Sequence, residues 1–152
     1  MDKWDKRFLS LAKEIATWSK DPSTQVGAVA IGDKGEVLAQ GYNGFPRGVK
    51  DLKERYENKD IKYRYVVHAE MNCIYNATYN GIGLDGATMY VWGLPLCNEC
   101  AKGIIQVGIA RVVSPKLETH LSRWKVSCFN AMDMLKEVEI EYDFYFMDFS
   151  LV

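Results

Sequence analysis

The sequence His68-Ala69-Glu70 is followed, 27 positions after the glutamate, by Cys97-Asn98-Glu99-Cys100. One imidazole and two thiolates can supply three ligands to a tetrahedral Zn²⁺ and leave its fourth position for water. Catalytic zinc sites are built in this way, whereas a structural site is closed by a fourth protein ligand. Glu70 is placed to carry protons to and from that water. The spacing is typical of zinc deaminases acting on cytosine or adenine, so the sequence predicts a hydrolytic deaminase.

Both halves of this pattern are predicted to lie at the starts of helices. One helix is expected from His68 to about Asn80, and another from Asn98 through Ile105. Free backbone N–H groups and the positive end of the helix dipole stabilise thiolates at such a start. Side chains two positions apart diverge by about 200° in mid-helix. In a first turn, however, His68 and Glu70 can both reach a pocket beyond the helix end.

Two alternatives to a catalytic metal centre are a structural zinc knot and a cysteine pair that binds no metal. A knot needs a fourth ligand. Cys73 lies five residues after His68, and Cys128 lies on the apolar stripe of a later helix. Both are interpreted as buried packing residues, because a free cysteine is often a small hydrophobe. His120, the other histidine, is interpreted as exposed and uninvolved.

The composition predicts a single zinc-dependent deaminase domain over residues 1–152. Hydrophobic residues make up 48% of the chain, and 19 Lys and Arg against 20 Asp and Glu leave a net charge of −1. The lack of a basic surplus favours a small substrate over nucleic acid. No signal peptide or run of transmembrane length is recognisable, and a Cys-x-x-Cys pair without secretory context indicates metal in a reducing compartment. We therefore expect a cytoplasmic protein without membrane or nucleic-acid partners.

Hydrophobic periodicity predicts an α/β domain with a central sheet. The expected elements are helix 3–19, strands 26–31 and 36–42, helix 68–80, strand 87–92, helix 98–105, strand 110–113, a helix marked by apolar residues from 121 to 135, and a strand over 138–146. The polar segment 43–66 is predicted to be a functional or mobile loop. One buried face of the last strand is predicted to comprise Val138, Ile140, Tyr142, Phe144 and Phe146.

Four stretches of the sequence resemble one enzyme family. His68–Asn72, Cys97–Lys102, Asp21–Ala28 and Gly41–Gly48 are similar to motifs of deoxycytidylate (dCMP) deaminases, a resemblance that spans about residues 5–115. It implies a three-layer cytidine-deaminase-like fold, with a central five-stranded mixed sheet flanked by helices. It also implies conversion of dCMP to dUMP and ammonia by a homohexamer. In such enzymes dCTP activates and dTTP inhibits, each bound with Mg²⁺.

Carried onto this chain, the resemblance implies one Zn²⁺ held by His68, Cys97 and Cys100, with Glu70 as proton carrier. The implied substrate-binding residues are Ser23, Thr24, Asn43, His68 and Glu70. The implied regulator-binding residues are Tyr42, Asn43, Gly44, Pro46, Arg47 and Gly48. An amide such as that of Asn43 can donate to and accept from a sugar hydroxyl at once. Asn43 can equally be a turn residue with positive φ, and the two hydroxyl residues can be simple turn residues.

The contacts to the substrate phosphate stay open. Candidate donors are Lys20, Arg47, Arg123 and the hydroxyls of Ser23 and Thr24, each of which can equally be a solvated residue. Trp124 is interpreted as a core residue, with stacking on a base as the alternative.

Two features depart from the usual family pattern. Leu96 replaces the proline before the first zinc cysteine, which leaves the ligands intact and puts the backbone path into them in question. No cysteine or histidine precedes His68, so the second, structural zinc of some relatives is not expected. The alternative functions are a zinc deaminase of tRNA adenosine or free cytosine and, from another class, a non-catalytic nucleotide-sensing module.

Overall fold

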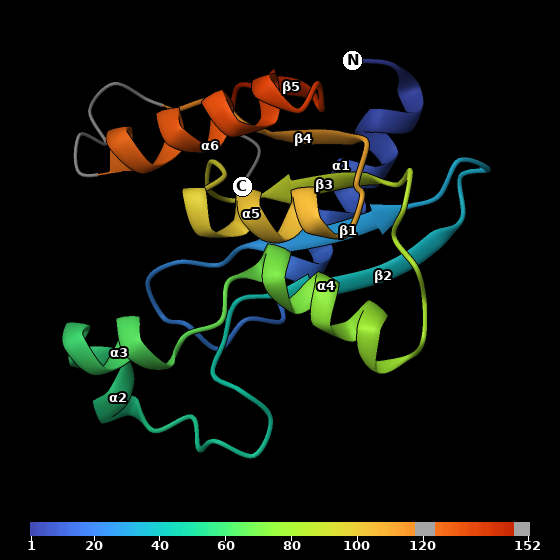
Figure 1. Cartoon of the computed structure of the whole chain (residues 1–152). Helices are drawn as coiled ribbons and strands as arrows, with labels where there is room; N and C mark the ends of the chain where they lie inside the picture. The colour runs from blue at the N-terminus through green and yellow to red at the C-terminus, as the bar shows by residue number, and fades with distance from the viewer. Residues whose placement is uncertain (118–123, 148–152) are drawn as a thin grey trace.

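A five-stranded mixed sheet forms the centre of the protein, in a computed structural model that describes residues 1–117 and 124–147 (Figure 1). The strands are β1 Gly27–Ile31, β2 Val37–Tyr42, β3 Thr88–Trp92, β4 Arg111–Pro115 and β5 Glu141–Tyr145. Their order across the sheet is β2-β1-β3-β4-β5. β1 runs antiparallel to β2 and β3, whereas β3, β4 and β5 are parallel. This arrangement confirms the predicted α/β class and the five-stranded mixed sheet.

Helices cover both faces of the sheet and complete three layers. α1 (Lys3–Ala16) lies on one face, whereas α4 (Ala69–Tyr79), α5 (Asn98–Gln106) and α6 (Lys125–Glu137) lie on the other (Figure 1). Successive side chains of β1 point to opposite faces of the sheet, as the strand pleat requires. Val29 and Ile31 pack in the cluster that includes α1, and Ala28 and Ala30 pack in the larger cluster that includes the other three helices.

Gly41 of β2 allows α4 to pack directly against the sheet. A Cβ at this position would overlap the backbone nitrogen of Cys73 and would lie 2.6 Å from the carbonyl oxygen of Ala69. Both neighbours belong to α4, so a side chain here would displace the helix whose start carries His68. The glycine that opens the Gly41–Gly48 motif therefore has a packing role.

The segment 43–66, predicted to be a loop, contains two short helices. These are α2 (Lys53–Glu57) and α3 (Lys59–Tyr65), and we call residues 53–65 the strap. The Asn58 side chain caps α3 by accepting from the backbone N–H of Ile61 at 3.2 Å. The ring of Phe45 stacks on Tyr56 with centroids 4.3 Å apart. The loop prediction was wrong over the strap, because helices of five and seven residues are too short to show a hydrophobic period.

The last strand differs in part from its prediction over 138–146. Glu139 has a φ of 60°, which turns the chain before β5 begins. The members of the predicted buried face that pack against the core are Ile140 and Tyr142. Phe144 and Phe146 are 39% and 73% exposed, whereas Tyr145 is buried and donates its hydroxyl to a β3 carbonyl oxygen at 2.6 Å. Strict alternation fails here because both faces of β5 contribute to the core: Tyr145 packs in the smaller cluster, and Ile140 and Tyr142 pack against the larger one.

A buried ion pair joins α1 to β4. The Asp5 carboxylate is 4% exposed and accepts from the Arg111 guanidinium at 2.8 and 3.2 Å and from the Tyr90 hydroxyl at 2.7 Å. The Arg111 hydrogen bond outweighs the opposing effect of burial and lowers the pKa of Asp5 from 3.8 to about 2. A carboxyl whose pKa is lower in the folded state stabilises the fold above its unfolded pKa. That stabilisation is lost as the pH falls from about 4 to about 2.

We expect Asp5→Asn to lower the free energy of unfolding by about 2 kcal/mol near neutral pH, with the difference from wild type shrinking toward about pH 2. Urea unfolding over this pH range measures both effects. Asp143→Asn is the matched control, because Asp143 also binds Arg111, at 2.7 Å, but is 42% exposed. Asp143→Asn should lower the free energy of unfolding by less than about 1 kcal/mol. Identical unfolding curves for Asp5→Asn and wild type at neutral pH would contradict the expectation.

Candidate active site

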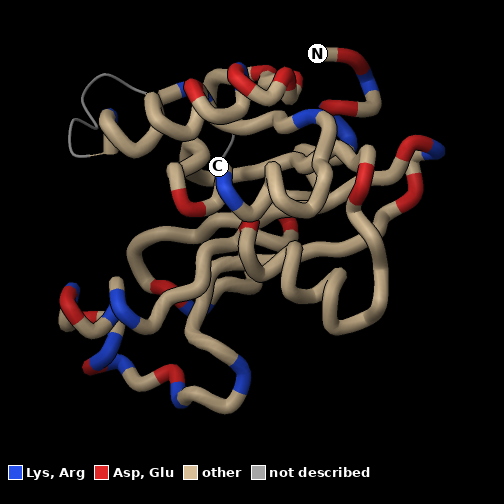
Figure 2. Tube along the Cα trace, viewed as in Figure 1, with Lys and Arg blue, Asp and Glu red and all other residues tan. Residues whose placement is uncertain are grey.

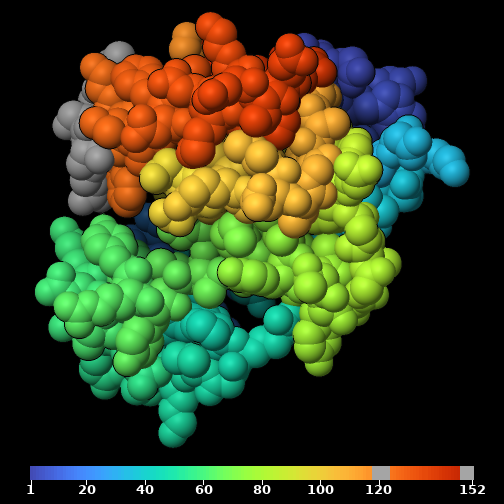
Figure 3. Space-filling model, in the orientation of Figure 1, coloured from blue at the N-terminus to red at the C-terminus, as the bar shows by residue number. Residues whose placement is uncertain are grey.

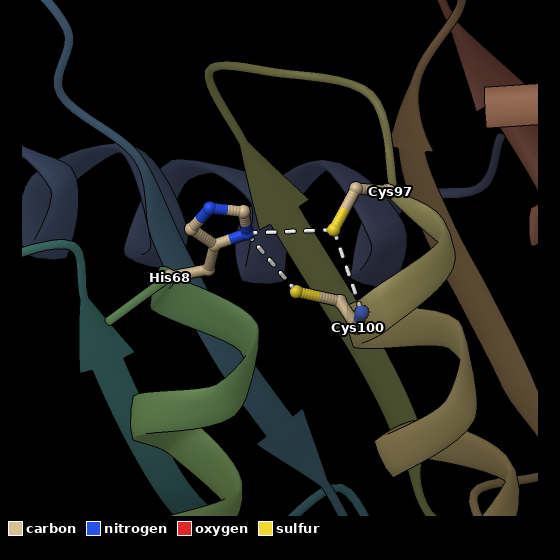
Figure 4. A group of neighbouring side chains, drawn as sticks. All are labelled: His68, Cys97 and Cys100. Carbon is tan, nitrogen blue, oxygen red and sulfur yellow. Dashed lines mark hydrogen bonds between the residues drawn. The ribbon is translucent and has the colours of Figure 1, made fainter. Parts of the chain in front are cut away.

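Two helix starts meet at one face of the larger core, as the sequence predicts. His68 is the residue before α4, and Cys97 is the residue before α5, each with extended backbone. Cys100 lies in the first turn of α5. Figure 4 shows the His68 ring facing both sulfurs, with Nδ1 3.4 Å from the Sγ of Cys97 and 3.4 Å from that of Cys100.

The donor geometry fits a tetrahedral zinc ion. With Zn–N and Zn–S bonds of the usual length, the N···S edge of a tetrahedron is about 3.5 Å, close to both distances in this site. All three donor atoms lie within 4.8 Å of one another, and no other histidine, cysteine or carboxylate within residues 1–117 and 124–147 joins them. A structural zinc site needs a fourth protein ligand, and the described residues supply none. The residues His68, Cys97 and Cys100 form the zinc site typical of the family described below.

Hydrogen bonds among the donor groups shift their pKa values. The hydrogen bond from Cys100, and then that from the His68 ring, lowers the pKa of the Cys97 thiol to about 4 against the effect of burial. Cys97 in turn raises the pKa of His68 to about 9. Cys97 and burial together raise the pKa of the Cys100 thiol. Zinc requires deprotonated thiols and a neutral imidazole, so binding of the metal releases protons.

Glu70 stands beside this group, in the first turn of α4. Its side chain is buried, with 4% of the residue exposed, and its Oε2 atom lies 3.6 Å from the Cys100 sulfur. Burial raises the pKa of the Glu70 carboxyl above its ordinary value. The structure thus brings a carboxyl group next to the metal ligands, at the position where the sequence predicts the proton carrier.

Contacts behind Cys97 hold its helix start in place. Leu96, at the position where the family resemblance implies proline, is 1% exposed and packs in the larger core cluster. The backbone N–H of Asn98 donates to the Ser127 hydroxyl at 3.0 Å, and that hydroxyl donates to the Asn98 side chain at 2.6 Å. Leucine therefore leaves the ligands together. Sequence analysis missed Ser127, and nothing in the local sequence marks a serine on α6 as a partner of α5.

Asn43 holds the backbone of the segment 19–26, which we call the 19–26 loop. Its Oδ1 atom accepts from the N–H of Val26 and its Nδ2 atom donates to the carbonyl of Thr24, both at 2.9 Å. Asn43 is 6% exposed and its φ is not positive, so the alternative of a left-handed turn at this residue was wrong. The next residue, Gly44, exchanges two backbone hydrogen bonds with Val67, which precedes His68. This bridge brings Asn43 and the loop close to the metal ligands.

A cavity of about 600 Å³ lies between α4 and the segment that comprises the end of β2 and the residues after β2. Of the predicted regulator residues, those that line it are Tyr42, Gly44, Pro46 and Arg47, whereas Asn43 and Gly48 do not. Asn72, Asn76 and Asn80 of the α4 side add amide groups to the lining, and Arg47 donates to the Asn76 side chain. A hollow between residues 40–50 and α4 is visible in Figure 3.

The other described residues singled out in the sequence analysis are not among the metal donors. Lys20 pairs with Asp51 at 3.0 Å on the surface. Cys73 and Cys128 are buried core residues, as interpreted from sequence. Trp124 is half-buried at the start of α6. The predictions for His120 and Arg123 concern residues outside the described part of the chain.

An α/β fold in which two helix starts hold a three-donor His-Cys-Cys site defines the class of cytidine-deaminase-like zinc proteins. The chain matches the family described as cytidine and deoxycytidylate deaminase zinc-binding region over residues 2–115. It belongs to this family, which confirms the resemblance drawn from the sequence motifs.

Several relatives and solved structures are similar to this chain. An uncharacterized deaminase in the luxG 3′ region of Aliivibrio fischeri is 41% identical over 93% of this chain and 92% of its own length. The deoxycytidylate deaminases of Mus musculus and Homo sapiens are 45% and 44% identical over 72% of this chain, and the match spans 63% of the length of each. The structure of dCMP deaminase from cyanophage S-TIM5 superposes with a TM-score of 0.75 at 21% identity, covering 95% of this chain and 100% of that one. At this identity the superposition establishes the shared fold.

Proposed function

We propose that this chain is a zinc-dependent dCMP deaminase, which hydrolyses dCMP to dUMP and ammonia and so supplies dUMP for thymidylate synthesis. The observation that carries the proposal is the three-donor site with a buried carboxyl group, that of Glu70, at its side. The choice of dCMP is supported by mammalian relatives named deoxycytidylate deaminase. It is also supported by the cyanophage enzyme of the same fold, whose structure is known in complex with dCMP and dUMP.

In the proposed reaction a water oxygen forms a bond to C4 of the cytosine ring, and the C4–amine bond breaks to release ammonia. His68, Cys97 and Cys100 would hold the zinc ion, which supplies Lewis-acid activation of water when bound. Glu70 takes one proton from the attacking water and passes it to the ring nitrogen. It then takes the remaining proton from the new C4 hydroxyl group and delivers it to the departing amine as the C4=O bond forms. The burial of this carboxyl group, 3.6 Å from the Cys100 sulfur, supports this role.

The 19–26 loop is proposed to bind the nucleotide beyond the ring. Ser23 and Thr24 are proposed to line the nucleotide pocket. The Ser23 hydroxyl donates to Asp21 and accepts from Lys62, which leaves it one further acceptor lone pair. The Asn43 amide already makes two internal hydrogen bonds, and its remaining donor and acceptor capacity is available to a deoxyribose hydroxyl. His68 and Glu70 complete the proposed substrate contacts.

Substrate choice is tested by ammonia release from the zinc-loaded protein on dCMP, CMP, free cytosine and tRNA. We expect a kcat/KM for dCMP at least about 10²-fold above that for free cytosine, because a site built to hydrogen-bond the sugar and phosphate discriminates strongly against an analogue that lacks them. We also expect dCMP to be preferred over CMP and tRNA. Turnover of tRNA or free cytosine in preference to dCMP would support the alternative deaminases. No turnover of any of these by protein that retains zinc would support the nucleotide-sensing module.

We also propose that the cavity beside α4 binds the regulators dCTP and dTTP with Mg²⁺, in a homohexamer. Arg47 and three asparagine side chains supply a cation and hydrogen-bonding groups suited to a nucleoside triphosphate. With dCTP and Mg²⁺ the substrate concentration at half-maximal velocity should fall, and dTTP should reverse this. Arg47→Ala should abolish the response, whereas Arg64→Ala on the strap should preserve it. Velocity curves that do not change with either nucleotide, or a monomer by light scattering, would remove this part of the proposal.

The predicted cytoplasmic location belongs with these proposals. The four cysteines are free thiols, which agrees with a reducing compartment. Within the described residues, none of the helices has the length and apolar character that a bilayer-spanning helix requires.

A further inference from the structure

The strap forms hydrogen bonds to the 19–26 loop through the charged side chain of Lys62. No residue of α3 is buried, so this helix adds little to the apolar core. The Lys62 side chain is nevertheless 13% exposed, because it reaches across to the loop. Figure 1 shows α2 and α3 set apart from the sheet, at the lower left, and Figure 2 shows basic and acidic residues interleaved along them.

The Lys62 ammonium is fully engaged with two residues of the loop. Its Nζ atom lies 2.9 and 3.0 Å from the two carboxylate oxygens of Asp21 and 2.9 Å from the Ser23 hydroxyl. The Asp21 side chain is 2% exposed. Lys62 is therefore neutralised within the protein, and it differs from Lys20, whose ion pair with Asp51 lies at the surface.

The same Asp21 carboxylate forms the turn that carries the proposed nucleotide contacts. Its Oδ1 atom accepts from the backbone N–H of Ser23 at 2.9 Å, from that of Thr24 at 3.2 Å, and from the Ser23 hydroxyl at 3.0 Å. One buried anion thus organises two amides and a hydroxyl, and one cation from the strap compensates its charge.

A buried carboxylate without a partner is costly, and removing one member of a buried ion pair is strongly destabilising for that reason. Burial alone would raise the pKa of Asp21, but Lys62 and the turn amides together lower it. Without Lys62, the Asp21 carboxylate would have a lower free energy if it turned toward water. The amides of Ser23 and Thr24 would then lose their acceptor, so the turn depends on the strap.

We propose that Lys62 is a positioning residue, which locks the Asp21–Thr24 turn so that Ser23 and Thr24 face the nucleotide. The proposal rests on the proposed function for the substrate, whereas the coupling between strap and turn is independent of it. Lys62→Met should raise KM for dCMP roughly tenfold and leave kcat within about twofold, because the metal ligands and Glu70 do not contact Lys62. Lys62→Arg keeps the charge and should recover most of the loss. Lys53→Met is the matched control, because Lys53 forms an exposed pair with Glu57 on the same strap.

Amide hydrogen exchange on the full zinc-loaded chain tests the coupling without any turnover. Peptides covering residues 20–26 should exchange faster in Lys62→Met and in Asp21→Asn, and at the wild-type rate in Lys53→Met. In the double variant Asp21→Asn/Lys62→Met no unpaired charge is buried, so it should lie closer to wild type than either single variant. This double variant also supplies the measurement if Lys62→Met does not fold.

The outcomes separate the two proposals. Faster exchange in Lys62→Met together with a raised KM supports the positioning role. Faster exchange in a protein whose wild type does not turn over dCMP supports the coupling and removes the proposed substrate. The proposal is overturned if residues 20–26 exchange at the wild-type rate in Lys62→Met. It is also overturned if kcat and zinc content fall while KM is unaltered, because that is the pattern of a merely structural residue.

Discussion

Glutamine in place of Glu70 is expected to lower kcat for dCMP roughly 10³-fold while zinc content stays at the wild-type level. Proton transfer by a positioned side chain contributes on the order of 10²–10⁴-fold to a rate. The amide has the shape of the carboxyl group and cannot accept and return the proton. Because Glu70 is not one of the three metal donors, the metal should remain. Steady-state assay and elemental analysis of the same preparation measure the two quantities together.

The same substitution should leave stability unchanged or raise it. Glu70 is 4% exposed, and burying a carboxyl group costs more than burying a neutral amide. Loss of activity with gain of stability marks a residue kept for chemistry. Glu14→Gln, the same chemical change at an exposed position of α1, is the control and should alter neither quantity. Retention of more than about a tenth of wild-type kcat by the Glu70 variant would exclude Glu70 as the proton carrier.

The metal site was predictable from sequence because its residue types and spacing are unusual in themselves. A Cys-x-x-Cys pair and a His-x-Glu pair each mark a helix start, and zinc ligands must converge. The order of most helices and strands followed from hydrophobic periodicity in the same way. These signals are local, so a single sequence can carry them.

Contacts between charged residues that are far apart in the sequence give no such local signal. Lys62 meets Asp21 across 41 positions, and Arg111 meets Asp5 across 106. Each of the four looks like an ordinary solvated residue in its own segment, because charge type alone does not select a partner. The turn geometry around Asp21, and hence the environment of the proposed nucleotide contacts, could be seen only in the folded chain.

The misassigned segments have equally physical reasons. The strap is held by the stacking of Tyr56 on Phe45 and by one buried ion pair, neither of which produces a hydrophobic period. In the last strand, the left-handed turn at Glu139 and the burial of Tyr145 on the face opposite Tyr142 break the alternation on which the prediction relied. Short elements are determined by tertiary contacts more than by their own sequence.

Removing one zinc ligand should have the second large effect. Cys97→Ala deletes a thiolate from a site with three protein donors, and we expect it to lower zinc affinity by more than the 10–100-fold typical of outer contacts and to abolish deamination. At a free zinc concentration of about 10³ times the dissociation constant, bound metal stabilises the fold by about 4 kcal/mol. The variant should therefore also lose the zinc-dependent rise in melting temperature. Cys128→Ala is the control, since this cysteine is also buried but lies outside the donor group. Wild type stripped with a chelator should regain full activity at one zinc per chain, and two tightly held zinc ions per chain would contradict the single three-donor site.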